Sequence, residues 1–267
     1  MSTASSSASA SRRTPSCWTA RPRPTRRSCW PPSRCSTSAG RHAVGLLDRL
    51  LGRRPAAPAA ALPGPGELAH APPLGLRVGG RLQFDRTMYG VAPGVMTEEL
   101  PGGYQGVPCY GHIDLGDGYA LHRFYLDDDA FLQVSTVSGD VDGIQGFIFH
   151  ETVHPPDKAA FQRFVTGDAH LGAAGIDYAG HRWTRATQTT AGDERIPPMV
   201  YDEVLYRHQP PRRDDDLTHY AMLYSREVPE LSRQELLLVS AEDSGPADFS
   251  ITYSVGVELT IADLDIT

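Results

Sequence analysis

The stretch Phe249-Ser-Ile-Thr-Tyr-Ser-Val-Gly-Val-Glu-Leu259 decides the fold class of this chain. Apolar residues alternate in it with small or polar ones, and side chains two positions apart lie on one face of a strand. It therefore predicts a long β-strand with one apolar face. An apolar run at 234–240 precedes it, and 242–248 between them is rich in turn formers. With a strand predicted at 217–227, the three segments indicate an antiparallel meander.

The two-residue period recurs upstream. We expect further strands at 76–84, 111–114, 119–126, 131–137, 144–150, 182–187 and 200–206. Asp127-Asp-Asp129 lies between two of these segments and favours a hairpin turn. One amphipathic helix is predicted at 157–165, before Gly167. The sequence thus predicts an α+β, mainly β fold, a single antiparallel β-rich domain over 74–267 with one or two short helices.

The composition excludes two functional classes. The chain has 267 residues, of which 40% are hydrophobic and 21% charged, as in ordinary globular proteins. No apolar run approaches the roughly 20 residues of a membrane helix, so we expect no transmembrane segment. The formal charge of −7 argues against a general nucleic-acid-binding protein, which would carry a basic stripe.

The charge is distributed unevenly. Residues 1–43 contain eight arginines and no acidic residue, so the other 224 residues carry 17 basic and 32 acidic groups, a formal charge of −15. Because 1–43 also lack Val, Ile, Leu, Phe and Tyr, they predict a disordered Arg/Ser-rich leader. A transit peptide and a basic tail are open interpretations, and a secretory signal is disfavoured by the missing apolar core. We favour a mis-assigned start, with Val44 as the first residue, which leaves Cys109 as the single cysteine and fits a reducing compartment.

Residues 44–54 predict a short amphipathic helix. Its apolar face is formed by four leucines: Leu46, Leu47, Leu50 and Leu51. Arginines near its end suit either peripheral contact with a membrane or docking on a partner, and packing on the chain's own domain is the alternative. A Pro/Ala-rich linker follows at 55–73.

The sharpest chemical motif is His150-Glu-Thr-Val-His154, a literal H-E-x-x-H. In zinc proteases a helix places both histidines on one face beside the glutamate. Here a strand pattern precedes the motif and Pro155-Pro156 follows it, which disfavours a helix. On a strand the two histidines lie about 13 Å apart, too far for one zinc ion. We therefore expect no catalytic, cofactor-binding or metal-binding residue, with a metal site at His150, Glu151 and His154 as the alternative.

Other candidate sites have bland explanations. Asp127-Asp-Asp129 and Asp214-Asp-Asp216 do not match EF-hand spacing and are interpreted as solvated turns. Cys109 and His112 are expected on opposite faces of a strand, with the thiol buried. No nucleophile elbow or phosphate-binding loop occurs. Most strand tyrosines are expected to fill the β-core rather than a binding surface: Tyr201, Tyr206, Tyr220, Tyr224 and Tyr253.

Several short blocks carry a family resemblance. They are Gly111-His-Ile-Asp-Leu-Gly116, His122-Arg-Phe-Tyr-Leu126, Asp128-Asp-Ala-Phe-Leu-Gln-Val134, Val200-Tyr-Asp-Glu203, Tyr220-Ala-Met-Leu-Tyr-Ser-Arg226 and Glu235-Leu-Leu-Leu-Val-Ser-Ala-Glu242. Over about 44–267 the chain resembles the YjfK-like family of uncharacterised bacterial proteins. No catalytic residue is established for that family, so the resemblance supplies none. The resemblance implies a cytoplasmic accessory role beside membrane-stress proteins, near the inner membrane.

The sequence predicts a non-enzymatic cytoplasmic binding module that acts with protein partners near the inner membrane. Two alternatives remain open at this point: a metal-dependent hydrolase using the H-E-x-x-H residues, and a carrier of a lipid or small molecule in a β-rich cavity. Stoichiometric zinc that depends on the two histidines would favour the hydrolase.

Overall fold

The computed structural model describes residues 71–167, 171–186, 194–208, 211–245 and 248–267. The predicted leader, the predicted helix at 44–54 and most of the predicted linker lie outside these residues. The elements are β1 (Arg81–Phe84), α2 (Thr87–Val91), β2 (Gln105–Gly106), β3 (Cys109–Gly116), β4 (Tyr119–Tyr125), β5 (Ala130–Val137), β6 (Asp140–Val153), α3 (Lys158–Thr166), β7 (Gly175–Tyr178), β8 (His181–Arg185), β9 (Met199–Tyr206), β10 (Arg213–Val228), β11 (Arg233–Gly245), β12 (Asp248–Leu259) and β13 (Leu264–Ile266).

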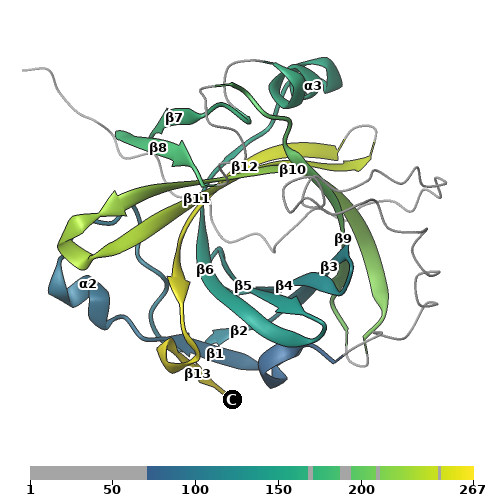
Figure 1. Cartoon of the computed structure of the whole chain (residues 1–267). Helices are drawn as coiled ribbons and strands as arrows, with labels where there is room; N and C mark the ends of the chain where they lie inside the picture. The colour runs from purple at the N-terminus through teal and green to yellow at the C-terminus, as the bar shows by residue number, and fades with distance from the viewer. Residues whose placement is uncertain (1–70, 168–170, 187–193, 209–210, 246–247) are drawn as a thin grey trace, which may run out of the picture. The chain divides into compact units, whose positions relative to one another are not determined.

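Eight of these strands close into an antiparallel barrel (Figure 1). Neighbours pair in the order β11-β12-β6-β5-β4-β3-β9-β10, and a further ladder between β10 and β11 joins the ends. Closure pairs every barrel strand on both sides, which removes the exposed edges that an open sheet would leave. The predicted mainly β fold with two short helices is therefore confirmed, whereas closure was not predicted.

The predicted meander is present as β10, β11 and β12. Leu238 pairs with Leu223 on one side and with Ser254 on the other, so the apolar run at 234–240 is a central strand. The turn predicted at 242–248 is too long, because β11 continues to Gly245 and Glu242 pairs with Ser250. Glu242 also accepts side-chain hydrogen bonds from Thr252 at 2.9 Å and Ser250 at 3.3 Å, which connect this part of β11 to β12.

Other boundaries also shift. The strand predicted at 76–84 is shorter, since a 3-10 turn occupies Pro73–Gly75 and Gly79 adopts a positive φ of 81° before β1 begins. The hairpin predicted around Asp127-Asp-Asp129 is confirmed by the ladder between β4 and β5. The predicted helix is α3, whose N-cap Asp157 accepts a hydrogen bond from the backbone N–H of Ala160 at 2.7 Å.

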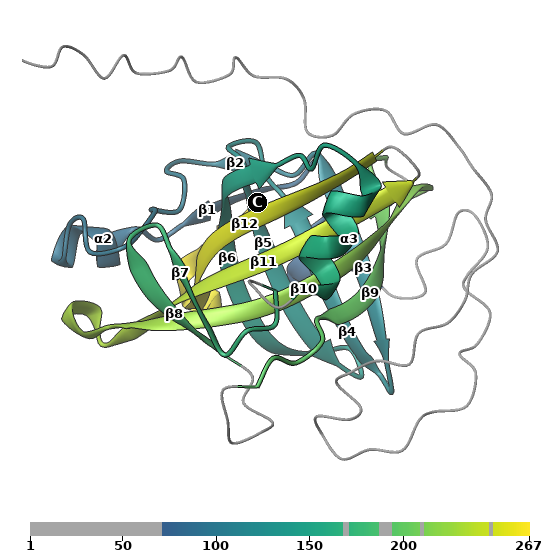
Figure 2. The same cartoon turned by 90° about the horizontal axis from the view of Figure 1, so that it is seen from above.

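Both faces of the barrel wall are buried over long stretches. The apolar face of β12 points outward, where Val255 packs with Trp183 of β8, and Ile251 packs with Phe161 of α3. Figure 2 shows α3 lying over β11 and β12. A small sheet in the order β13-β1-β2 covers another part of the wall, around Phe84 and Leu132. The small and polar face of β12 consequently points into the barrel.

Candidate functional site

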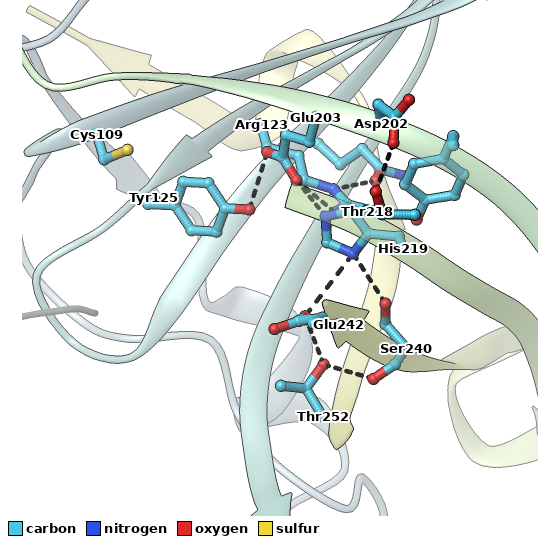
Figure 3. Close-up of polar contacts among 12 residues, drawn as sticks. Cys109, Arg123, Tyr125, Asp202, Glu203, Thr218, His219, Ser240, Glu242 and Thr252 are labelled. Carbon is cyan, nitrogen blue, oxygen red and sulfur yellow. Dashed lines mark hydrogen bonds and ion pairs between the residues drawn. The ribbon is translucent and has the colours of Figure 1, made fainter. Parts of the chain in front are cut away.

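A polar cluster occupies the interior of the barrel (Figure 3). Eight inward side chains form what we call the barrel cluster, and each is at most 7% exposed: Arg123, Tyr125, Tyr201, Glu203, His219, Ser240, Glu242 and Thr252. They come from β4, β9, β10, β11 and β12, at positions where the two-residue period points side chains inward. A cluster of buried ionisable groups is a candidate functional site.

Arg123 and Glu203 form the centre of the barrel cluster. The guanidinium Nη1 donates to the Glu203 carboxylate at 3.0 Å, and Nη2 donates to the Tyr201 hydroxyl oxygen at 2.8 Å. Nε donates to the side-chain oxygen of Gln133 at 3.0 Å. The Tyr125 hydroxyl donates to the second Glu203 oxygen at 2.9 Å. A buried ion pair needs this degree of hydrogen bonding to offset the loss of hydration.

His219 continues the barrel cluster towards β11. Its Nε2 lies 2.7 Å from a Glu203 carboxylate oxygen, and its Nδ1 lies 2.9 Å from the Ser240 hydroxyl. Glu242 lies farther away, with 3.8 Å between Nδ1 and Oε1. Thr252 donates to the same Glu242 oxygen at 2.9 Å. A continuous hydrogen-bond network therefore connects β4 to β11 across the barrel.

The two buried glutamates differ in their electrostatic environment. Burial would raise the pKa of Glu203, but Arg123 and the hydrogen bonds from His219 and Tyr125 outweigh it, so this pKa lies below its ordinary value. Burial dominates at Glu242 and raises its pKa, although His219 acts in the opposite direction. Glu203 is accordingly the stable anion, while Glu242 keeps its proton to a higher pH.

A glycine makes room for the central carboxylate. Gly111 faces inward on β3, and a Cβ atom at this position would lie 1.7 Å from Oε1 of Glu203. Any side chain at 111 would therefore displace the carboxylate from Arg123 and Tyr125. The requirement is for space rather than backbone freedom, since the glycine lies in a regular ladder with β4 and β9.

Ser240, His219 and Glu203 have the order of contacts that nucleophilic catalysis uses: hydroxyl, imidazole, carboxylate. Their exposed fractions are only 2%, 1% and 0%. A working nucleophile must touch its substrate, and Ser240 is flanked by Ala221 on β10 and Thr252 on β12. The three side chains form a hydrogen-bonded chain that links β9, β10 and β11. The surrounding side chains bury the Ser240 hydroxyl, so a substrate could not reach it.

A groove lies outside the barrel, where β8 diverges from β10. It has a volume of about 730 Å³ and is lined by residues of β8, β10 and β11, among them Arg182, Thr184, Ser225, Arg226, Glu227 and Gln234. We call it the β8 groove. Its lining is mainly polar, unlike the apolar pockets that hold most small ligands.

A family model described as a protein of unknown function, DUF2491, matches residues 46–265. The chain belongs to this family. It is also similar to the uncharacterized protein YjfK of Escherichia coli strain K12, with 25% identity over 201 residues, which cover 73% of this chain and 90% of the relative. The resemblance inferred from the sequence blocks is thereby confirmed. No solved structure gives a significant match.

The H-E-x-x-H residues of this DUF2491 protein lie apart from the barrel cluster. His150 is an extra residue in β6, between Phe149 and Glu151, which both pair with β12, and its Nδ1 lies 3.2 Å from Glu98. Glu151 accepts a hydrogen bond from Tyr178 at 3.2 Å, and His154 follows the end of β6. Across the described ranges, no group of three His, Cys, Asp or Glu side chains is placed to hold a metal ion.

The other predicted candidates have local roles. Cys109 is 3% exposed and faces the barrel interior, whereas His112 lies against His122 on the outer side, so their predicted separation is confirmed. Asp127 accepts a hydrogen bond from the backbone of Gly106 at 2.9 Å. The turn predicted at Asp214-Asp-Asp216 is wrong, because these residues belong to β10, where Asp214 accepts a hydrogen bond from the backbone of Arg207 at 2.7 Å.

The barrel cluster was not predicted from the sequence. Glu203 lies on the same strand face as Tyr201 and Leu205, and Arg123 shares a face with Leu121 and Tyr125. A charged residue in the middle of an apolar strand face is the signal that could have found them, because such residues are rarely buried without a partner.

In the described part of the chain, no helix is both long and apolar enough to cross a membrane.

Proposed function

We propose that this DUF2491 protein is a non-enzymatic binding module that works by holding a partner protein on its outer surface. The observation that carries the proposal is the enclosure of the barrel cluster. Its acid and base groups are hydrogen-bonded to one another and at most 7% exposed, so they are suited to holding the strands together. Active sites instead need groups that reach a substrate.

The two alternative functions receive less support from the geometry. For a hydrolase, His150 and Glu151 contact Glu98 and Tyr178 rather than sharing a ligand site with His154. For a carrier, the barrel would need an apolar cavity, whereas its interior holds an ion pair and stacked rings, such as Phe131 and Phe147 at 5.0 Å between centroids. A partner-binding surface outside the barrel needs neither feature.

The proposal includes a location at the cytoplasmic side of the inner membrane. It rests on the family context and on the four leucines of segment 44–54, a segment outside the described residues. In the full chain, Leu46→Asp/Leu50→Asp should move the protein from the membrane fraction to the soluble fraction, because charge on the apolar face opposes insertion. Leu46→Met/Leu50→Met is the matched control and should stay with the membranes. Equal partitioning of both variants would contradict this location.

The test of the binding function is affinity capture of the full chain from detergent-solubilised cells of its own source. We expect one or two proteins in near-stoichiometric amounts, identified by mass spectrometry and recovered again when the partner carries the tag. A bait recovered alone under mild detergent and after chemical crosslinking would contradict the binding function.

A further inference from the structure

A surface patch surrounds the residues of the H-E-x-x-H motif that the proposed function leaves unused. We call it the β6 patch, and it contains Glu98, His150, Glu151, Tyr178 and Tyr253. His150 and Glu151 are exposed, and the two tyrosines are partly exposed. The Glu98 side chain, from the segment between α2 and β2, is 45% exposed. A partner can therefore reach this patch from solvent.

Three aromatic rings of the β6 patch pack on one another. The rings of Tyr178 and Tyr253 are stacked, with 4.6 Å between their centroids and 9° between their planes. The imidazole of His150 meets the Tyr178 ring edge-on, with 5.6 Å between the centroids. The backbone carbonyl of Tyr178 also accepts a hydrogen bond from the indole N–H of the buried Trp183 at 3.0 Å. The rings are therefore fixed in place before any partner binds.

Two carboxylates flank these rings. Oε1 of Glu98 lies 3.2 Å from Nδ1 of His150, and Glu151 accepts a hydrogen bond from the Tyr178 hydroxyl at 3.2 Å. Burial raises the pKa of Tyr178, and the negative charges of Glu151 and Glu98 raise it further. Both carboxylates therefore act on the same ring, although they come from segments more than 50 positions apart in the chain.

The charge of these two carboxylates is not cancelled by a permanent cation. Within the described ranges, neither Glu98 nor Glu151 forms an ion pair with an arginine or lysine, and a neutral imidazole at 150 leaves both charges in place. Arginines on adjoining segments are already paired with other carboxylates: Arg86 with Glu99, Arg182 with Asp177 and Arg226 with Glu235. The β6 patch is therefore negative, on a domain whose residues after 43 carry a formal charge of −15. Such a surface attracts a cationic segment.

We propose that the β6 patch binds an arginine-containing segment of a partner protein, whose guanidinium groups pair with Glu98 and Glu151 and lie against the rings. This inference rests on the proposed binding function and names the surface and the partner chemistry. A guanidinium suits the patch better than an ammonium, because it pairs with carboxylates through a planar fork and stacks on aromatic rings. Since the sequence favours Val44 as the first residue, we assign the arginines to a partner rather than to the leader. Arginines two positions apart on an extended segment point to the same side.

The test uses an acetylated and amidated peptide, Gly-Arg-Ser-Arg-Gly, with the full 267-residue chain, followed by saturation-transfer difference NMR at low salt. We expect saturable transfer to the arginine side-chain protons that weakens as salt is added. A peptide with citrulline in place of both arginines keeps the shape and loses the charge, so it should bind at least about fivefold more weakly.

Two matched double variants locate the binding. Glu98→Gln/Glu151→Gln removes both carboxylates of the β6 patch and should weaken binding of the arginine peptide by about fivefold or more. Asp140→Asn/Asp142→Asn makes the same change in net charge at exposed positions near the opposite end of β6. This control should leave binding within about twofold of the parent.

Several results would overturn the inference. Equal weakening in the two double variants would indicate a non-specific charge effect. Equal binding of the citrulline peptide, or of a peptide with lysine in place of both arginines, would show that the patch does not recognise a guanidinium. Absence of saturable transfer to the arginine peptide would have the same consequence. Capture of a cellular partner that Glu98→Gln/Glu151→Gln leaves intact would refute the β6 patch as the binding surface while leaving the binding function in place.

Discussion

Removing one partner of the central ion pair should cost more than removing both. Arg123 and Glu203 have side-chain exposures of 4% and 0%, and their charged atoms lie 3.0 Å apart. Arg123→Leu would leave the Glu203 carboxylate buried without its cation, and Glu203→Leu would leave the guanidinium without its anion. Breaking a buried pair in this way costs about 3–5 kcal/mol of unfolding free energy.

The double variant Arg123→Leu/Glu203→Leu removes both charges and fills the space with apolar atoms. We expect it to be more stable than either single variant, giving a coupling energy of about 2 kcal/mol or more. Urea denaturation of the full chain followed by far-UV circular dichroism measures all four proteins, and Glu203→Gln extends the series if a leucine variant fails to fold. Glu258→Gln, at an exposed position on β12, is the control and should lie within about 0.5 kcal/mol of the parent. Single losses below about 1 kcal/mol that add without coupling would refute the enclosed ion pair.

Three further predictions follow from particular residues. Gly111→Ala should lower the free energy of unfolding by at least about 2 kcal/mol, because the added Cβ would displace the Glu203 carboxylate. Gly90→Ala in α2 is the control and should be nearly neutral, since no atom lies within 4 Å of an added Cβ. Equal losses in urea denaturation would contradict the close approach of Gly111 to Glu203. The stabilising effect of ionised Glu203 is fully present above the pKa of an unfolded glutamate, about 4.3, and is lost as the pH falls through the lower pKa of Glu203 in the folded state. Glu242 has a raised pKa in the folded state, so its effect has the opposite sign. The stability that protonated Glu242 contributes is present below pH about 4.3 and is lost as the pH rises from there through the folded pKa. In unfolding measured at several pH values, the cost of Glu242→Gln should therefore shrink above pH 4.3 while that of Glu203→Gln should shrink below it, and parallel pH profiles would refute the assignment. Asp157→Ala should cost about 1 kcal/mol by removing the cap of α3, and Asp157→Asn should restore most of it.

The eight barrel strands were predictable because each is encoded locally, whereas the short strands β2, β7 and β13 were not predicted. Alternation over 249–259 gave the position of β12, and the acidic triplet at 127–129 gave the hairpin that joins β4 to β5. The closing ladder between β10 and β11 is also local, and it belongs to the predicted meander. What the sequence does not encode locally is the pairing of β3 with β9 and of β6 with β12, which joins strands far apart in the chain.

The barrel cluster escaped prediction for the same reason. Arg123 and Glu203 are 80 residues apart, and neither belongs to a motif of fixed spacing. The alternation that predicts β12 marks its apolar face as the core-facing side, but that face packs outside the barrel, and Thr252 lies on the inner face. The H-E-x-x-H pattern was easy to find because its residues are contiguous, but His150 and Glu151 contact different neighbours in the folded chain.

We infer that the barrel cluster supports the fold and does not perform catalysis. Treatment of the folded full chain with a fluorophosphonate, followed by intact-mass measurement and peptide mapping, tests this inference, because the reagent labels serines activated by a neighbouring base. We expect no adduct at Ser240, which is 2% exposed beside His219. An adduct on Ser240 that forms in the folded parent, and is lost in a folded His219→Gln variant, would refute the inference and identify the barrel cluster as an active site.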